Sequence, residues 1–250
     1  MTIVVCTYQR REVYTTIRML CLLIIPLSNL KLLVIDNEGN SELKEFCEDI
    51  GVEYFYERVL GLSHARNAAL NLTKNEWVYF VDDDVYVTEE LLEELSLNHD
   101  KARVLYSYVV PAVLPVIEGE FVAYSLANSL SIHGSSIMPI GCSFGFYNSG
   151  DLRFDVTLGR VGRNLAGEEE NVFISELMKK GHSLKLLRGA VVHRIGDKLH
   201  LNYVQGYFKN QILSTGKNRR LRILFHVLRS TVSRNSRVYR KALMKVYRDL

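Results

Sequence analysis

The sequence lacks a long apolar run, and this excludes one class of protein at the outset. The stretch Met19–Leu27 contains Pro26 and is well short of the ~20 apolar residues that a membrane-spanning helix needs. The pattern of a secretory signal peptide, in which basic residues precede an apolar stretch, is also missing. Here Arg10 and Arg11 follow the apolar stretch Ile3–Cys6. We therefore expect a cytoplasmic protein without a membrane-spanning helix.

Cysteine is scarce, and no two cysteines are close together in the sequence. A disulfide framework or a structural zinc site needs more cysteines or a Cys-x-x-Cys spacing. The sequence therefore predicts reduced cysteines, packed as ordinary core residues, at positions Cys6, Cys21, Cys47 and Cys142.

Charge of either sign is nearly balanced over the whole chain, with 31 Lys and Arg against 28 Asp and Glu. A hydrophobic share of 48% with 24% charged residues is typical of a globular domain and argues against disorder. The balance is uneven, because Lys217–Leu250 holds eleven Lys or Arg and one acid.

This basic segment carries leucine and aromatic residues at helical spacing, which predicts two amphipathic helices. Such helices suit an anionic membrane surface, so we expect residues 217–250 to hold the protein on the inner face of the membrane. Packing of the same helices on the core, with solvated charges, is the alternative. No nucleic-acid-binding motif accompanies the charge, so we expect no nucleic-acid partner.

The first hundred residues alternate strand and helix patterns. Strands separated by helices at this interval predict a parallel α/β sheet covered on both faces. Ser41 is expected to cap a helix that stops at Gly51, and Ser63 to cap one that runs through Leu70. The expected strands are Ile3–Cys6, Leu32–Ile35, Val52–Tyr56 and Trp77–Val81.

The second half of the chain is less regular. Prolines and clustered glycines between Lys101 and Arg163 indicate mixed strands and loops. A helix is expected over Glu168–Lys180, because basic residues end it and Gly181 follows. A strand is expected over Gly189–Val192.

Three consecutive carboxylates, Asp82, Asp83 and Asp84, follow the expected strand that ends at Val81. Their mutual repulsion calls for a nearby positive charge, and a divalent cation with oxygen ligands would supply it. A solvated acidic turn before the helix that begins near Thr88 is the alternative.

Polar residues follow the other strands at the same expected edge of the sheet. The segment Thr7-Tyr8-Gln9-Arg10 follows the first strand and Asp36-Asn37 follows the second, where an open α/β sheet binds its ligand. Asp36 is suited to accept hydrogen bonds from a base or ribose, or to hold a turn. Arg66 lies in the first turn of its helix, within reach of a diphosphate.

These motifs, in this order and spacing, resemble the family 2 glycosyltransferases. The matching segments are Cys6–Arg10, Val34–Asn37, Gly61–Leu70, Asp82–Asp84, Gly167–Glu169 and Val191–His193. The resemblance implies a GT-A fold, that is, a Rossmann-like, mixed and mainly parallel sheet flanked by helices, with the basic helical extension after it. It covers about residues 1–195. Together with the charge pattern of the last residues, it predicts a catalytic domain over 1–216, with a nucleotide-sugar half (1–100) and an acceptor half (101–216), and the basic tail 217–250.

The resemblance also implies a role for individual residues. Thr7, Tyr8, Asp36 and Arg66 would bind the nucleotide, while Asp82 and Asp83 would contact the ribose or donor sugar. Asp84 would hold Mg²⁺ or Mn²⁺, and His193 would complete the metal site. Glu168 would contact the acceptor or donor sugar, and Glu169 would be the general base.

Two positions depart from the family pattern. Gln9 stands where asparagine is usual, and Glu169 stands where aspartate is more common. Because Glu170 follows directly, either glutamate can be the base.

The implied reaction is an inverting transfer of a sugar from a nucleoside diphosphate sugar, expected to be a UDP-sugar, to a hydroxyl of a glycan or lipid-linked acceptor. The expected context is the synthesis of a cell-surface polysaccharide or glycolipid. Such a reaction needs one carboxylate as base and a cation for the leaving group, and the sequence offers both. A sugar-phosphate nucleotidyltransferase and a non-catalytic scaffold of the same fold are the alternatives.

Overall fold

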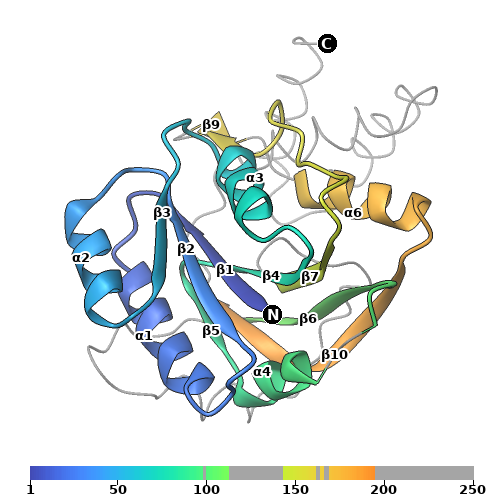
Figure 1. The fold of residues 1–250 in the computed structure, drawn as a ribbon, viewed down its shortest axis with the longest axis horizontal. Coiled ribbons are helices and arrows are strands. Elements are labelled where there is room, and N and C mark those ends of the chain that lie inside the picture. Colours follow the sequence, from blue (N-terminus) through green and yellow to red (C-terminus); the bar gives the residue numbers. More distant parts are fainter. Residues whose placement is uncertain (98–99, 113–142, 162–163, 166–168, 195–250) are drawn as a thin grey trace, which may run out of the picture.

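A computed structural model describes residues 1–97, 100–112, 143–161, 164–165 and 169–194. Within them, an eight-stranded sheet forms the centre of the fold, in the order β3-β2-β1-β4-β7-β6-β10-β5 (Figure 1). In that order the strands span Glu53–Tyr56, Lys31–Asp36, Thr2–Thr7, Glu76–Asp82, Ser143–Asn148, Arg103–Ala112, Ser183–Arg194 and Val85–Val87. A separate two-stranded sheet pairs β8, Arg160–Val161, with β9, Asn164–Leu165.

The large sheet is mixed, as the family resemblance implied. The first four strands along the chain, β1 to β4, pair in parallel and coincide with the four expected strands. Strand β7 is antiparallel to both β4 and β6, and β5 is antiparallel to β10. The strand expected over Gly189–Val192 is the middle of the longer strand β10. The predicted α/β class with a mixed, mainly parallel sheet is confirmed.

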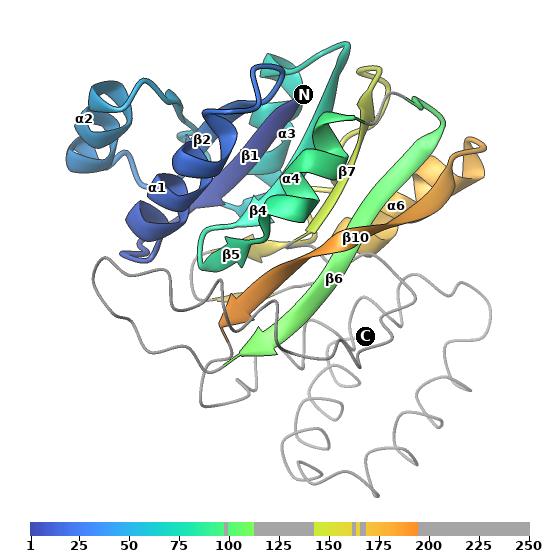
Figure 2. The same ribbon diagram turned by 90° about the horizontal axis from the view of Figure 1, so that it is seen from below.

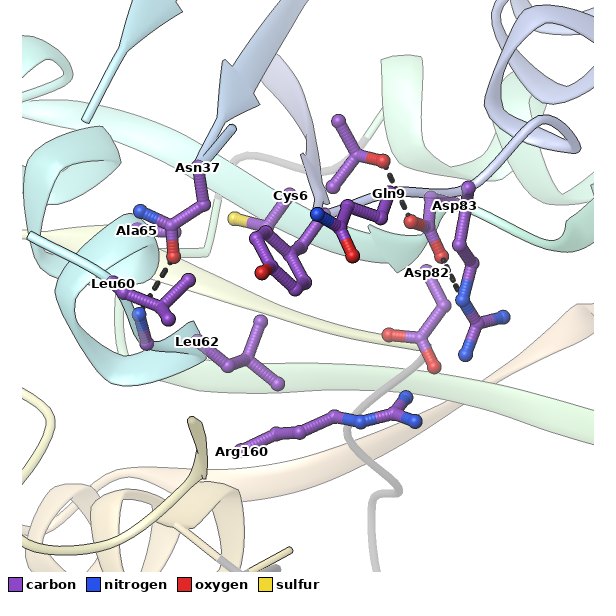
Figure 3. Close-up of a pocket in the computed structure, with 13 residues that line it drawn as sticks. Cys6, Gln9, Asn37, Leu60, Leu62, Ala65, Asp82, Asp83 and Arg160 are labelled. Atoms are coloured by element: carbon purple, nitrogen blue, oxygen red, sulfur yellow. Dashed lines mark hydrogen bonds and ion pairs between the residues drawn. The ribbon is translucent and has the colours of Figure 1, made fainter. Parts of the chain in front are cut away.

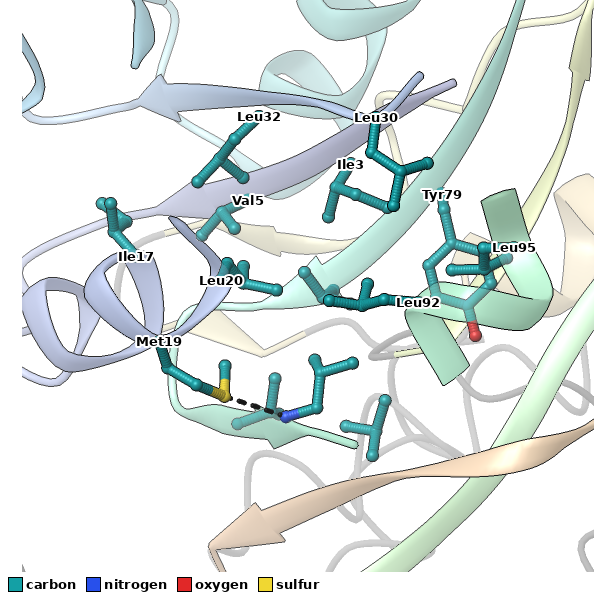
Figure 4. Close-up of a cluster of buried hydrophobic side chains, with 14 of the residues drawn as sticks. Ile3, Val5, Ile17, Met19, Leu20, Leu30, Leu32, Tyr79, Leu92 and Leu95 are labelled. Atoms are coloured by element: carbon teal, nitrogen blue, oxygen red, sulfur yellow. Dashed lines mark hydrogen bonds between the residues drawn. The ribbon is translucent and has the colours of Figure 1, made fainter. Parts of the chain in front are cut away.

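Helices cover both faces of this sheet because successive strand side chains point to opposite sides. Ile3 and Val5 of β1 pack into one core cluster with residues of α1, α2 and α4, and Figure 4 shows the part of it formed with α1 and α4. Val4 packs with α3 and α6 on the other face. Figure 2 shows the same arrangement from below. The helices span Val13–Ile24 (α1), Ser41–Asp49 (α2), Leu62–Leu72 (α3), Glu89–Ser96 (α4) and Glu169–Lys179 (α6).

The start of two helices differs from the expectation. Asn40, and not Ser41, caps α2, since its side-chain oxygen accepts from the backbone N–H groups of Glu42 and Leu43. Ser63 lies inside the first turn of α3 and does not cap it.

The structure also bears on the expectations for the cysteines, for a membrane-spanning helix and for the basic segment at the end of the sequence. The described cysteines Cys6, Cys21 and Cys47 are free thiols, but only Cys47 is a fully buried core residue, because Cys6 and Cys21 are half-buried. Cys142 lies outside the described residues. Among the described helices, none has the length and apolar character needed to cross a bilayer. The basic segment 217–250 also lies outside the described residues, so its helices remain a prediction.

Gly145 of β7 allows a close approach between two neighbouring strands. It pairs with Tyr79 of β4, and a Cβ at this position would lie 2.5 Å from both Tyr79 Cδ2 and the Val78 carbonyl oxygen. Since a backbone atom cannot move aside, we expect Gly145→Ala to lower the free energy of unfolding by about 2–3 kcal/mol. Urea denaturation monitored by circular dichroism measures this loss.

Gly51 provides the control for this prediction. A Cβ there would have no heavy atom within 4 Å, although its φ of +71° disfavours any L side chain. Gly51→Ala should therefore lose only the conformational cost of about 1 kcal/mol. Equal losses in the two variants would contradict the proposed clash with Tyr79.

Candidate active site

A cavity of about 280 Å³ opens at the carboxyl ends of the parallel strands (Figure 3). The strand register brings the ends of β1, β2 and β4 side by side at this cavity, because Thr7 pairs with Asp36 and Cys6 pairs with Asp82. Four of the predicted site residues, Thr7, Tyr8, Asp82 and Asp83, line the cavity. Burial raises the pKa of the Cys6 thiol to about 12, so this part of the wall is neutral.

The three aspartates after β4 have three different environments. Asp83 is buried, and its carboxylate accepts a 2.7 Å hydrogen bond from Thr7 Oγ1. Burial raises the pKa of Asp83 to about 6, with Arg10 and Thr7 acting in the opposite direction. Asp84 pairs with Arg10, while the Asp82 side chain is 35% exposed beside the cavity. Asp82 is therefore the member of the triplet that a ligand reaches most easily.

Arg10 is a site residue to which the sequence pattern assigned no role. Its Nε lies 3.4 Å from Asp83 Oδ1, and its Nη1 pairs with Asp84 Oδ2, so one guanidinium joins two of the aspartates. The preceding Gln9 has a φ of 53°, a left-handed conformation that asparagine adopts more readily than most residues. The departure at Gln9 thus falls on the turn between Tyr8, which lines the cavity, and Arg10, which pairs with the acidic cluster.

Asp36 is not brought to the cavity, although the sequence placed it at the nucleotide site. Its carboxylate accepts from the backbone N–H groups of Glu38 and Asn40 and from the hydroxyl of Tyr54. It therefore holds the turn between β2 and α2. The next residue, Asn37, lines the cavity and accepts a hydrogen bond from Gly61 N–H.

Arg66 lies in the interior, between the acidic triplet and the candidate base. Its side chain is 3% exposed, and its Nη1 donates to Glu169 Oε1 at 2.5 Å. The same guanidinium lies 4.0 Å from Asp82 Oδ1 and 3.9 Å from Glu170 Oε2. The structure thus connects three of the predicted site residues through one arginine, and Arg66 itself does not line the cavity.

One face of α3 organises the segment that leads to Arg160. Ser63 Oγ donates to the carbonyl of Leu158, and the Asn67 side chain exchanges two hydrogen bonds with the backbone of Phe154. Gly159, with a φ of +92°, passes so close that a Cβ would lie 2.5 Å from Ser63 Oγ and 3.4 Å from Glu169 Cδ. This segment therefore packs directly against the candidate base.

Glu169 is a buried carboxyl group in the first turn of α6. Burial and the negative charge of Glu170 raise its pKa, and Arg66 opposes the rise. A raised pKa suits a general base that must take up a proton near neutral pH. Glu170 is more exposed, at 16%, and Glu168 lies outside the described residues.

Arg160 of β8 is a second cation that sequence reasoning missed, because no motif surrounds it. It lines the cavity, and Figure 3 shows its side chain extending toward Asp82. Burial and the charge of Arg10 lower its pKa, while Asp83 and Asp82 raise it. With Arg10, it places positive charge in the cavity lining, beside Asp82 and Asp83.

Among the described residues of this region, carboxylates outnumber guanidinium groups. Asp82, Asp83, Asp84, Glu169 and Glu170 are accompanied by Arg10, Arg66 and Arg160. The excess negative charge and the carboxylate oxygens fit a hard divalent cation.

The second predicted metal ligand, His193, is placed by its backbone alone. It pairs with Val85, the residue after Asp84. Among the residues whose side chains are described, no group of three or more His, Cys, Asp or Glu has a metal-binding arrangement.

Comparison with solved structures shows the fold. Residues 1–349 of TarS from S. aureus, in complex with UDP-GlcNAc, match with a TM-score of 0.57 and 16% identity over 89% of this chain and 69% of that one. The mannosyltransferase PcManGT from Pyrobaculum calidifontis, in complex with GDP-Man and Mn²⁺, matches with a TM-score of 0.59 and 14% identity. That match covers 84% of this chain but 61% of PcManGT, and a second TarS structure is covered over 41% of its length.

Comparison with sequences shows the family. No curated protein sequence matches. The family model described as "Glycosyl transferase family 2" matches residues 2–126, half of the chain, which include the strand ends and the aspartates Asp82 and Asp83 that line the cavity. The chain therefore belongs to glycosyl transferase family 2 and is a nucleotide-sugar-dependent glycosyltransferase.

Proposed function

We propose that this glycosyltransferase inverts the anomeric centre of a UDP-sugar, with Glu169 as base and a divalent cation at the acidic triplet. One observation carries the proposal: Arg66 connects the buried Glu169 carboxylate, at 2.5 Å, with Asp82 at the cavity, at 4.0 Å. The candidate base therefore lies one side chain away from the carboxylate that faces the donor.

In the proposed reaction, the proton of the acceptor hydroxyl and the nucleoside diphosphate leaving group each have a defined destination. Glu169 takes the proton of the acceptor hydroxyl, whose oxygen forms a bond to the anomeric carbon of the sugar. The bond between that carbon and the diphosphate oxygen breaks, and the nucleoside diphosphate leaves from the opposite face. A single displacement of this kind inverts the anomeric configuration.

The donor would occupy the cavity at the strand ends. Thr7, Tyr8 and Asn37 would contact the nucleotide, with Asn37 in the cavity position that the sequence analysis gave to Asp36. Asp82 would contact the ribose or donor sugar. Asp83, fixed by Thr7 and Arg10, would hold the loop in place.

The donor set of the triplet fits a hard cation, as its oxygen ligands and excess negative charge indicate. Asp84 and His193 would hold Mg²⁺ or Mn²⁺, with the donor diphosphate supplying further oxygens. Such a cation supplies charge neutralisation for the leaving diphosphate. PcManGT, a protein of similar fold, holds Mn²⁺ together with GDP-Man, which supports the same class of cofactor here.

Donor hydrolysis tests the proposed function directly. The protein should release UDP from one member of a panel of UDP-sugars in the presence of Mn²⁺, and EDTA should stop the release. GDP-Man serves as the comparison donor, since a protein of similar fold binds it. Release of GDP without release of UDP would contradict the UDP-sugar assignment, and release of neither nucleotide would contradict the proposed activity.

Arg160 should contribute to donor affinity by contacting the diphosphate. We expect Arg160→Met to raise the Kd for UDP about tenfold, because a charge-assisted hydrogen bond contributes about 1.5–3 kcal/mol. Isothermal titration calorimetry with UDP measures the change. Arg188, an exposed cation outside the cavity lining, is the control, and Arg188→Met should bind UDP like the wild type. Equal affinities of all three proteins would exclude a diphosphate contact for Arg160.

The acceptor remains a proposal from the family resemblance. A glycan or lipid-linked hydroxyl would approach Glu169, with Glu168 beside it, in a cell-surface polysaccharide or glycolipid pathway. A lipid-linked acceptor would suit the predicted membrane contact of residues 217–250. The family assignment argues against the nucleotidyltransferase and scaffold alternatives.

A further inference from the structure

Arg66 occupies a position that does not suit a diphosphate ligand. The guanidinium side chain is 3% exposed, as is the Glu169 side chain to which it donates at 2.5 Å. A donor in the cavity would meet Arg10 and Arg160, which line it, before it could reach Arg66. The positive charge needed beside a diphosphate is therefore supplied by residues other than Arg66.

Aromatic rings surround the same guanidinium and limit its movement. The Arg66 Cζ atom lies 5.4 Å from the ring centre of Phe154, 5.8 Å from that of Phe80 and 6.0 Å from that of Phe144. Each contact lies within the range of a cation–π interaction, and the rings keep water away from the ion pair. The direction of the Arg66 side chain is thereby fixed toward Glu169.

We infer that Arg66 is the positioning residue of the base, which fixes the Glu169 side chain in place and favours its carboxylate form, and is not a ligand of the donor. This inference rests on the proposed function, in which Glu169 is the base. Under this inference, Arg10 and Arg160 contact the diphosphate of the donor. Arg66 acts instead on Glu169, the residue that takes the proton of the acceptor.

Within the described part of the chain, the charges that face Glu169 come from three elements. Arg66 of α3 is the cation among them, while Glu170 of α6 and Asp82 of β4 are negative. Burial and Glu170 favour the protonated form of Glu169, and Arg66 favours the carboxylate. Removal of Arg66 would leave two negative neighbours and a buried site, so Glu169 would stay protonated to a higher pH.

A direct titration of Glu169 tests this inference. Protein labelled with ¹³C at the glutamate Cδ reports the titration midpoint by NMR, and Glu169→Gln identifies the resonance. We expect Arg66→Met to raise the midpoint by about 1–2 pKa units, since a nearby opposite charge shifts a carboxyl group by that order. Arg66→Lys, which keeps the charge but loses the planar fork, should raise it less. An unchanged midpoint in Arg66→Met would overturn the inference.

A binding experiment compares two proteins that both lack the Glu169 carboxylate, so that only the presence of Arg66 differs between them. The variants Glu169→Gln and Arg66→Met/Glu169→Gln are titrated with UDP and Mn²⁺ by calorimetry. We expect their Kd values for UDP to agree within about twofold. If Arg66 bound the diphosphate, its removal would raise the Kd about tenfold or more. A tenfold weaker double variant would overturn the inference. Turnover retained by Glu169→Gln would overturn the proposed base. Failure of UDP to bind the wild-type protein would overturn the proposed donor. In either case the NMR titration would still show whether Arg66 favours the carboxylate form of Glu169.

Discussion

Glu169→Gln should abolish turnover while leaving nucleotide affinity almost unchanged. The amide keeps the size of the side chain but cannot take the acceptor proton, and general bases contribute about 10²–10⁴-fold to rate. We expect kcat to fall by about 10³-fold and the Kd for UDP to change by less than about twofold. Release of UDP in the presence of acceptor and calorimetry with UDP measure the two quantities.

Glu170→Gln is the matched control, since the two glutamates are neighbours in the first turn of α6. Glu170 is the more exposed of the two and lies 3.9 Å from Arg66, so its loss should lower kcat by less than about tenfold. If Glu170→Gln abolishes turnover and Glu169→Gln does not, the base is Glu170.

The pH dependence of the wild-type rate provides a further check on the base. The pKa of Glu169 is raised by burial, so the carboxylate needed to accept a proton is lost as the pH falls through this raised value. The rate should therefore decline on the acid side well above the pKa of about 4.3 of an ordinary glutamate. A rate that stays constant down to pH 5 would contradict the assignment.

Asp84→Asn should remove the metal-dependent part of nucleotide binding. The substitution keeps the shape of the side chain but removes the charge that would bind the cation, while Arg10 keeps Asp83 as an ion-pair partner. We expect the Kd for UDP in Mn²⁺ to rise about 100-fold, and the weak binding measured in EDTA to stay the same. Calorimetry in the two buffers gives both values.

Asp151→Asn controls for a general change in charge, since Asp151 is exposed and does not line the cavity. This variant should bind UDP like the wild type in both buffers. If Asp84→Asn keeps the wild-type affinity in Mn²⁺, Asp84 is not the ligand that holds the cation.

The parts of the fold that depend on local pattern could be predicted from the sequence. Strands β1 to β4 alternate with helices and carry apolar, β-branched residues, so their existence and parallel order follow from spacing. The caps were less predictable. Asn40 and Ser41 are both good capping residues, so the residue types alone do not show which of the two precedes the first helical residue. In the structure it is Asn40 whose side chain accepts from Leu43 N–H. Ser63 instead donates to Leu158, a partner 95 positions away that no local pattern reveals.

The candidate site was predictable to a similar extent. Asp82, Thr7 and Tyr8 are found at the cavity because they follow strands whose ends meet. Asp36 and Asn37 are adjacent, and it is the contact of Asp36 with Tyr54 that leaves the cavity to Asn37. Arg160 carries no motif, so its place at the cavity is known from the fold.

The pairing of Arg66 with Glu169 has a consequence for folding kinetics. The hydrogen bond joins residues 103 positions apart, and the one between Thr7 and Asp83 joins residues 76 apart. Contacts of such separation close long loops and form late, after local helices and neighbouring strands. Secondary structure should therefore return earlier than turnover when the denatured chain refolds, which makes enzymatic activity a reporter of the final step of folding.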